Sequence, residues 1–511
     1  MLLLTDWLAQ RAALSPTKTA LVDQTSGDRI SYEAWNAKVN QLAHFLQQQL
    51  GLQKGDRIAV LAHNCVSYLD LCMAAGKLGV ILQQMNWRLS ADELAQLLEE
   101  SPKALFYNDP TLPLVKPLQA KLDGVPSWVA MNSKARDEDL HLSAYASFPS
   151  TSPERPTLEW NDPWFLCYTG GTTGLPKAAI LSHGNVLTNA INTVISWGLD
   201  SNDMAVLNAP LFHTGGLNVF TLPLVYAGGT SIVCESFNVD ILFDLLEQEP
   251  VTVFFGVPTM FVMMQEHDRW ESSDFSKVKF VISGGAPCPM PIFEKFWARD
   301  IEFKTGYGLT EAGPNTFWLP AEHVKKKPGS VGKPLMHIEV SLVDETDNEV
   351  GPNEVGELRI RGSHVTQGYW NNPKGTAESL KNGWLYTGDL AMCDSDGFYY
   401  IVGRRKDMFI SGGENVYPAE VESVLHEFEE IGEAAVIGVP HPKWGEAGVA
   451  VVRPVEGYHP TSESILAYCK GKLAKYKIPR RVFLVDELPK TGAGKIDKKL
   501  LERSYHDLYS S

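Results

Sequence analysis

The sequence predicts an α/β protein with a large N-terminal domain, residues 1–405, and a small α+β C-terminal domain, residues 406–511. Three observations predict this fold class: the length of 511 residues, alternating strand and helix patterns in the first half, and a change of pattern in the last third. A chain of this length exceeds what one hydrophobic core usually serves, so at least two domains are expected.

The first third of the chain alternates between helix and strand patterns. A helical pattern runs from Glu33 to Leu50, and apolar strands follow at residues 58–61 and 79–82, with another helix between them. A capping box of serine and glutamate at residues 90–93 then predicts the start of a third helix. Such alternation is typical of a parallel sheet covered by helices.

The middle of the chain continues this pattern after a surface connection at residues 145–162, which is rich in Pro, Ser and Thr. Apolar strands are predicted at residues 251–255 and 278–283, and each ends at glycine. Parallel sheets bind ligands at the carboxyl ends of their strands, so these glycines are candidates for a binding site.

The predicted secondary-structure pattern changes twice in the last third of the chain. Residues 329–401 form short strands separated by Gly, Asn and Asp turns, which predicts a β-barrel-like subdomain. The charged stretch 403–407 then precedes a helix that begins at Pro418, followed by further strands and a helix. This final unit of about a hundred residues fits a small separate domain.

Composition limits the function classes. The net charge of −16, with no large basic cluster, argues against nucleic acid as a partner. No apolar run approaches the ~20 residues of a membrane span, and the N-terminus lacks a signal peptide, so a cytoplasmic location is expected. Seven single cysteines without a CxxC pair predict neither a disulfide framework nor a zinc cluster.

Two glycine-rich loops, each with a lysine, carry the chemistry. The first spans residues 168–177 and ends at Lys177, and the second spans residues 489–496 and contains Lys495. Glycines let backbone N–H groups turn toward an anion, and the hydroxyls of Thr172 and Thr173 add donors. The chain is therefore expected to handle a nucleotide with loops from two domains.

Three better-known motifs are excluded. The first loop is not a Walker A sequence, because Pro176 replaces the second glycine and Ala178 follows the lysine. Residues 306–308 are no dinucleotide fingerprint, since Glu311 occupies the place of the third glycine. A zinc-protease motif at His426 fails because Glu430 replaces its second histidine.

In combination, these segments resemble the adenylate-forming superfamily of acyl-CoA synthetases, firefly luciferases and nonribosomal peptide synthetase adenylation domains. The resemblance is closest to bacterial fatty-acyl- or aryl-CoA ligases. The matching motifs follow the family's order at residues 168–177, 306–311, 386–389, 403–407, 411–418 and 489–496.

The resemblance implies ATP, Mg²⁺ and CoA as cofactor and cosubstrates. Thr310 would touch the α-phosphate, Glu311 would hold Mg²⁺, and Lys495 would bridge the attacking carboxylate and the α-phosphate. Asp389 would bind the ribose with help from Arg404. The remaining ATP-binding residues that it implies are Thr169, Gly170, Gly171, Thr172, Thr173, Gly174, Lys177, Gly285, Ala286, Pro287, Tyr307 and Gly308.

Two positions depart from the family pattern. Gly170 stands where the family has serine, and Ala178 stands where it has glycine. One hydroxyl donor is lost, while the lysine and both threonines of the loop are kept. A changed ATP affinity is compatible with these departures, and loss of activity does not follow from them.

The acyl pocket is expected to include Phe212, His213, Gly256, Ser283 and Gly284. His213 resembles the gating histidine of aryl- and fatty-acyl-CoA ligases and is counted with the catalytic residues, although it is also compatible with a satisfied core histidine. The segments of this pocket contain no lysine or arginine, which favours an apolar monocarboxylate.

The acceptor is expected to be CoA. The resemblance implies that the small domain is mobile and turns at Lys406, bringing Gly412 and Gly413 to the adenylate so that a pantetheine arm can pass. Trp444 and Arg88 occupy positions that contact CoA in some relatives. A packed tryptophan and a solvated arginine are the alternatives.

The sequence thus predicts an ATP-dependent carboxylic acid–CoA ligase that forms acyl-CoA, AMP and pyrophosphate. Medium- or long-chain fatty acids are expected as substrates in preference to aryl acids. The alternatives are loading of a separate carrier protein, a luciferase-like oxygenase and a non-catalytic nucleotide-binding homologue. A homodimer is left open.

Overall fold

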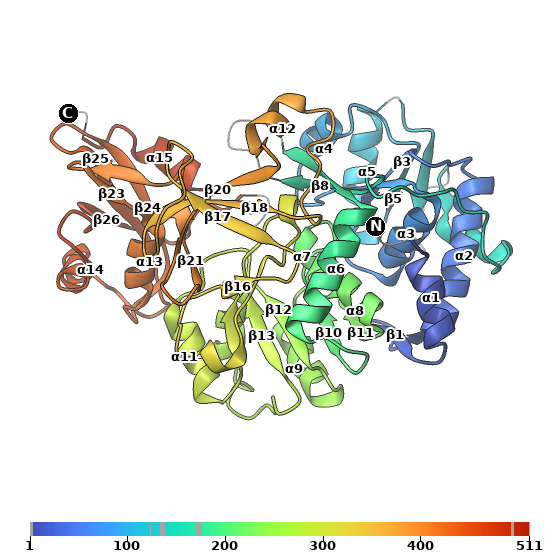
Figure 1. Ribbon diagram of the computed structural model, residues 1–511, viewed down its shortest axis with the longest axis horizontal. Helices are drawn as coiled ribbons and strands as arrows, with labels where there is room; N and C mark the ends of the chain where they lie inside the picture. The colour runs from blue at the N-terminus through green and yellow to red at the C-terminus, as the bar shows by residue number, and fades with distance from the viewer. Residues whose placement is uncertain (1–3, 123, 133–137, 170–175, 492–494, 510–511) are drawn as a thin grey trace.

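The computed structural model describes residues 4–122, 124–132, 138–169, 176–491 and 495–509. Figure 1 shows the chain passing from the N-terminal elements at one end of the long axis, through a central layer, to the C-terminal elements at the other end. This arrangement confirms the predicted fold class, a large N-terminal α/β part with a smaller C-terminal unit.

The first large sheet has seven strands in the order β7-β6-β5-β3-β4-β8-β9. The strands from β7 to β8 pair in parallel, as the alternation predicts, and only β9 runs antiparallel to its neighbour. The strand bounds are β3 Arg57–Leu61, β4 Ile81–Gln84, β5 Ala104–Tyr107, β6 Ser127–Ala130, β7 Leu140–His141, β8 Pro163–Thr169 and β9 Lys177–Ser182.

The second large sheet also has seven strands, in the order β14-β13-β12-β10-β11-β1-β2. Its edge is formed by the N-terminal β1 and β2, which lie about two hundred residues before their neighbour in sequence. The bounds are β1 Thr19–Asp23, β2 Arg29–Ser31, β10 Met204–Leu207, β11 Thr230–Val233, β12 Val253–Gly256, β13 Phe280–Ser283 and β14 Phe303–Thr305.

An antiparallel sheet follows where the sequence predicts the barrel-like subdomain. It pairs β17-β18-β20-β19, and β21 pairs with β20, while β15 and β16 form a separate ribbon. The bounds are β15 Phe317–Trp318, β16 Lys333–Pro334, β17 Glu339–Val343, β18 Val355–Arg361, β19 Leu380–Lys381, β20 Trp384–Cys393 and β21 Tyr399–Arg404.

The C-terminal sheet has the order β23-β22-β25-β24, and β26 pairs with β25. Long β24 and β25 run antiparallel and carry its buried core, which α13 and α14 cover (Figure 1). The bounds are β22 Phe409–Ser411, β23 Glu414–Val416, β24 Ile431–His441, β25 Gly445–Pro454 and β26 Arg481–Leu484.

Helices cover the faces of both large sheets and of the C-terminal sheet. The predicted capping box is confirmed, because Ser90 accepts from the backbone of Glu93 while the Glu93 side chain accepts from the backbone of Ser90. The helices are α1 Trp7–Leu14, α2 Tyr32–Gln48, α3 Val66–Leu78, α4 Ala91–Leu97, α5 Leu112–Gln119, α6 His183–Trp197, α7 Thr214–Asn218, α8 Thr221–Ala227, α9 Val239–Gln248, α10 Pro258–Glu266, α11 Met290–Ala298, α12 Pro373–Ser379, α13 Pro418–His426, α14 Ser462–Cys469 and α15 Lys498–Tyr505.

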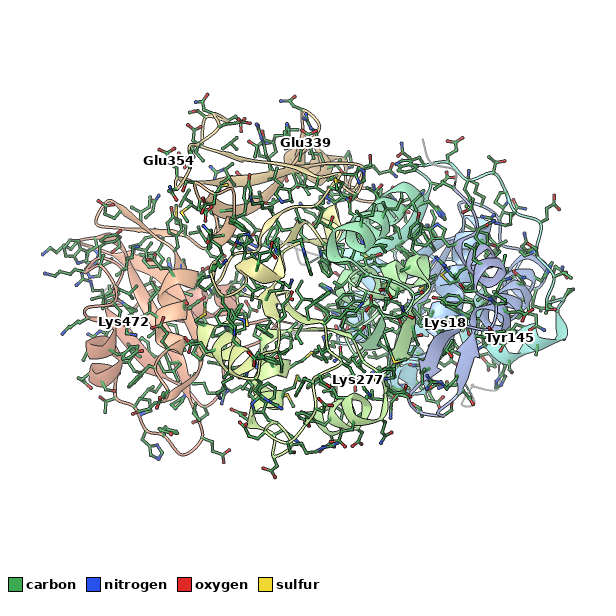
Figure 2. All side chains as sticks on the ribbon, turned by 60° about the horizontal axis from the view of Figure 1, so that its bottom comes forward. Lys18, Tyr145, Lys277, Glu339, Glu354 and Lys472 are labelled. Carbon is green, nitrogen blue, oxygen red and sulfur yellow. The ribbon has the colours of Figure 1, made fainter. Side chains whose placement is uncertain are left out.

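Charged side chains project from all sides of the molecule. Figure 2 shows Lys472 toward one end of the long axis and Lys18 and Tyr145 in the part of the molecule toward the other end, with Lys277 on the side opposite Glu339 and Glu354. Within the described residues, no helix is long and apolar enough to cross a membrane.

Candidate active site

Asp389 and Tyr307 form one end of the site. Asp389 lies on β20 directly opposite Arg404 of β21, so the sheet register brings their side chains together at 2.6 Å. The Tyr307 hydroxyl donates to the other Asp389 oxygen at 2.5 Å. Burial raises the pKa of Asp389, and Arg404 and the tyrosine hydroxyl oppose that shift. The carboxylate is thus oriented before any ligand arrives.

The segment after β14 forms a tight loop that carries Thr310 and Glu311. A methyl group at Gly308 would lie 2.1 Å from the Pro314 carbonyl oxygen, so only glycine fits there. The Thr316 N–H closes the loop onto the Tyr307 carbonyl at 3.1 Å. Thr310 and Glu311 are both buried at this turn.

The first lysine loop connects β8 and β9. Thr169 pairs directly with Lys177 across this hairpin, and the Thr169 hydroxyl lies 3.3 Å from Glu311 Oε1. The predicted phosphate residues Gly170, Gly171, Thr172, Thr173 and Gly174 lie outside the described residues. Lys177 and Glu311 therefore lie at the end of the site where the sequence predicts the phosphates, called the phosphate end below.

Tyr369 is a member of this group that the sequence reasoning missed. Its hydroxyl donates to Glu311 Oε1 at 2.7 Å, and its ring centroid lies 5.1 Å from Lys177 Nζ. The only sequence signal is an aromatic residue after Gly368, which is too common to single out. The contact depends on how the antiparallel sheet packs against β9.

Lys495 reaches the site from the C-terminal part of the chain. The Thr491 N–H donates to its carbonyl at 2.7 Å, and Lys490 bridges to Ile496, which together hold the loop closed. Burial, Arg404 and Lys406 lower the pKa of Lys495, while Asp389 opposes the shift. The residue is nevertheless solvent-accessible.

His213 caps the N-terminus of α7. Its Nδ1 accepts from the Gly215 N–H at 3.1 Å, so Nε2 carries the proton of the neutral ring. Burial lowers its pKa to about 4, with further lowering by Lys495 and Arg88. The side chain is nevertheless solvent-accessible.

The predicted acyl-pocket residues lie at the carboxyl ends of neighbouring strands. Gly256 ends β12 and pairs with Ser283 of β13, and the Gly284 N–H donates to the Gly256 carbonyl at 3.1 Å. Phe212 is buried one residue before His213. The following backbone at Gly285, Ala286 and Pro287 is exposed at the rim.

Phe255 crosses this pocket, although it was not among the predicted pocket residues. A methyl group at Gly215 would lie 3.3 Å from its ring, and one at Gly284 would lie 2.9 Å from it. The ring therefore fills the space between the two glycines, next to His213. Behind it lies a cavity of only about 10 Å³, lined in part by Gly216 and Phe220.

Arg88 lies on the aromatic residues beside this pocket. Its guanidinium is 4.8 Å from the Trp87 ring centroid and 5.8 Å from that of Phe212. Trp87 in turn stacks on His63 at 4.0 Å. The segments used to predict an uncharged pocket contain no arginine, but tertiary packing brings this one to the pocket edge.

Gly412, Gly413 and Trp444 form a separate group on the C-terminal sheet. Both glycines have positive φ, +65° and +88°, in the turn between β22 and β23. The Gly412 N–H donates to the Trp444 carbonyl at 2.9 Å, and Arg480 lies 5.1 Å from the Trp444 ring. No contact found among the described residues joins this group to the cluster around Lys495.

Lys406 lies beside a cavity of about 260 Å³, lined also by Asp407, Glu502 and His506. Burial lowers the pKa of Lys406, with a further contribution from Arg404.

A magnesium ion fits Glu311 only together with phosphate oxygens. Glu311 Oε1 is the acceptor for Tyr369 and lies near Thr169, whereas no hydrogen bond from the described residues occupies Oε2. The described part of the chain offers no group of three or more His, Cys, Asp or Glu that could hold a metal alone. Magnesium at nucleotide sites commonly uses one or two carboxylates plus phosphates.

Comparison with known proteins agrees with this arrangement. Residues 8–370 match the model of the AMP-binding enzyme family, and residues 420–495 match that of the AMP-binding enzyme C-terminal domain. A feruloyl-CoA synthase of Amycolatopsis sp is 38% identical over 98% of both chains. A long-chain-fatty-acid–CoA ligase of Mycobacterium tuberculosis is 34% identical over 98% of this chain and 97% of its own.

Solved structures give the same result. ATP-bound MatB from Rhodopseudomonas palustris is 30% identical, with a TM-score of 0.89, and 99% of each chain is covered. The family model spans more than half of the chain, and the relatives match nearly its whole length. The chain therefore belongs to the AMP-binding enzyme family.

Proposed function

We propose that this protein is an ATP-dependent acid–CoA ligase that works through an acyl-adenylate, with a compact aryl acid as its substrate. The position of Lys495 carries the proposal. Its charge favours a lower pKa for both His213, the predicted acyl-pocket residue, and Asp389, the predicted ribose ligand, so the lysine lies within electrostatic range of both. That is where a carboxylate and an α-phosphate would meet.

In the first half-reaction, a carboxylate oxygen of the acid attacks the α-phosphorus of ATP. A new P–O bond forms, the bond to pyrophosphate breaks, and the acyl-adenylate remains. Lys495 stabilises the negative charge that builds between the two reactants, Lys177 binds the β,γ-phosphates, and Asp389 and Tyr307 hold the nucleoside. Mg²⁺ at Glu311 would supply charge neutralisation on the phosphates.

In the second half-reaction, the CoA sulfur attacks the acyl carbonyl. A C–S bond forms, the bond to AMP breaks, and the thiol proton leaves to solvent. The glycine turn at 412–413 would line the path of the pantetheine arm after the C-terminal domain turns at Lys406. Trp444 and Arg88 would contact CoA, and the domain boundary at residues 405–406 belongs to the same proposal.

Phe255 supports an aryl acid ahead of a long-chain fatty acid, the reverse of the order expected from sequence. Its ring closes the pocket between Gly215 and Gly284, and the cavity behind it has room for about one water molecule. A flat ring can stack on Phe255, whereas a long alkyl chain needs that space open. The feruloyl-CoA synthase relative is consistent with this choice.

The test is CoA-thioester formation from ATP across cinnamates, arylacetates, octanoate and palmitate, with wild type and Phe255→Ala. Wild type should prefer one aryl acid, and Phe255→Ala should raise the palmitate-to-aryl ratio of kcat/KM about tenfold. Met263→Ala on the exposed side of α10 is the control and should leave the ratio unchanged.

Each other outcome has a definite meaning. A wild-type preference for palmitate would reverse the substrate order. Steady-state pyrophosphate release that CoA does not stimulate would favour a carrier protein as acceptor. No product with any acid would contradict the ligase. A cytoplasmic location and a homodimer remain predictions.

A further inference from the structure

The segment of residues 366–370 ties the antiparallel sheet to both sides of the phosphate end. The Thr366 N–H donates to the Glu311 carbonyl at 2.7 Å, and the Thr366 hydroxyl donates to the Ile180 carbonyl at 2.6 Å. The Ile180 N–H donates back to Gly368 at 3.0 Å. Ile180 lies on β9, the strand that begins at Lys177. One segment therefore fixes the backbones that carry the acid and the lysine.

Tyr369 adds side-chain contacts to the same two residues. Its hydroxyl donates to Glu311 Oε1 at 2.7 Å, and its ring lies 5.1 Å from Lys177 Nζ. The backbone of Tyr369 is also fixed, because its N–H donates to the Thr376 hydroxyl at 2.9 Å. The fixed tyrosine can thus restrict the positions of both the Glu311 carboxylate and the Lys177 ammonium group.

The direction of the hydrogen bond follows from the protonation states. An ionised carboxylate only accepts, so the tyrosine must donate. A tyrosine hydroxyl ordinarily keeps its proton at neutral pH, because its reference pKa is about 10. With Oε1 engaged in this way, Oε2 is the oxygen left for an external ligand.

We propose that Tyr369 is a positioning residue that holds Glu311 in the orientation needed for magnesium-dependent ATP binding. This inference rests on the proposed function, because it assigns Glu311 to the metal that accompanies ATP. Tyr369 itself would touch neither the reacting atoms nor the ion. The competing explanation is that Tyr369 merely stabilises the fold. The two explanations differ in whether the Tyr369 hydroxyl changes the effect of Mg²⁺ on ATP affinity.

The test measures ATP binding by calorimetry, once with Mg²⁺ and once with EDTA, for wild type and Tyr369→Phe. Phenylalanine keeps the ring beside Lys177 and removes the hydroxyl that donates to Glu311. The ratio of the Kd in EDTA to the Kd in Mg²⁺ should fall about tenfold, the loss typical of a hydrogen bond to a charged group. The Kd in EDTA should stay within about twofold of wild type.

Two further variants complete the design. Tyr369→Leu also removes the ring from Lys177, so it should weaken ATP binding in EDTA as well. Tyr400→Phe is the matched control, since it removes a tyrosine hydroxyl 3.4 Å from the Asp394 carboxylate in the same sheet. Tyr400→Phe should leave the magnesium ratio unchanged.

The outcomes separate this inference from the proposed function. An unchanged ratio in Tyr369→Phe, or equal weakening with and without Mg²⁺, would overturn the positioning role alone. A wild-type protein whose ATP binding does not respond to Mg²⁺ would overturn the inference and the proposed function together. The magnesium concentration for half-maximal pyrophosphate release should rise with the same variant.

Discussion

At the scale of single residues, the site depends on charged groups whose partners lie far away in sequence. The Asp389 carboxylate is shared by Tyr307 and Arg404, and Glu311 is held by Tyr369. The motifs identify Asp389, Glu311 and Lys177 because glycines and charged residues recur in a fixed order. Tyr369 and Phe255 could not be predicted from such motifs, because their contacts arise from packing between segments that are distant in sequence.

The buried His364 gives a residue-scale prediction about stability. It is 1% exposed, and neither ring nitrogen has a partner among the described residues. Burial lowers its pKa from 6.5 to about 3. The unfolded chain therefore takes up the proton first, so stability falls as the pH drops from 6.5 toward 3.

Thermal unfolding at pH 6.5 and pH 4 checks this prediction. The drop in Tm between the two pH values should be smaller by about 2–4 °C in His364→Leu than in wild type. The exposed His459→Leu should behave like wild type. An equal drop in all three proteins would contradict a protonation cost at His364.

At the scale of elements, periodicity predicted most of the strands and helices that carry the site. The strands expected at residues 251–255 and 278–283 are β12 and β13, and the predicted acyl-pocket residues lie at their ends. The pairing of β1 with β11 was not predicted. Local patterns do not specify which strands pair across about two hundred residues.

The turn between β22 and β23 gives an element-scale prediction. Gly413 has a φ of +88°, and a side chain there would meet nothing within 4 Å. A leucine would thus leave the sheet intact apart from local strain but would project into the proposed pantetheine path. Thioester formation should fall about tenfold in Gly413→Leu, while ATP–pyrophosphate exchange stays within about twofold of wild type.

Gly457→Leu is the matched control for this turn. Gly457 has a φ of +85° and equally open surroundings, so the backbone strain is similar. The Gly413 assignment fails if both variants lose thioester formation equally, or if Gly413→Leu slows both half-reactions alike.

At the scale of the whole molecule, the fold class follows from the sequence. The placement of the C-terminal unit relative to the large N-terminal part does not. Alternation and turn composition predicted the large α/β part, the antiparallel sheet and the C-terminal unit. The electrostatic interaction between Lys495 and Asp389 depends on the relative placement of these parts. That placement is set by surface packing and hinge geometry, which carry no local sequence signal.

The central claim is that Lys495 serves adenylate formation and is dispensable afterwards. The most direct test compares two rates in Lys495→Ala: adenylate formation from ATP and the preferred acid, and thioester formation from synthetic acyl-adenylate and CoA. Lys490→Ala, which breaks only an ion pair with Glu433 at 2.9 Å, is the control. The account predicts that Lys495→Ala slows the first rate about a hundredfold or more and spares the second. Equal slowing of both rates, or no effect on the first, would contradict it.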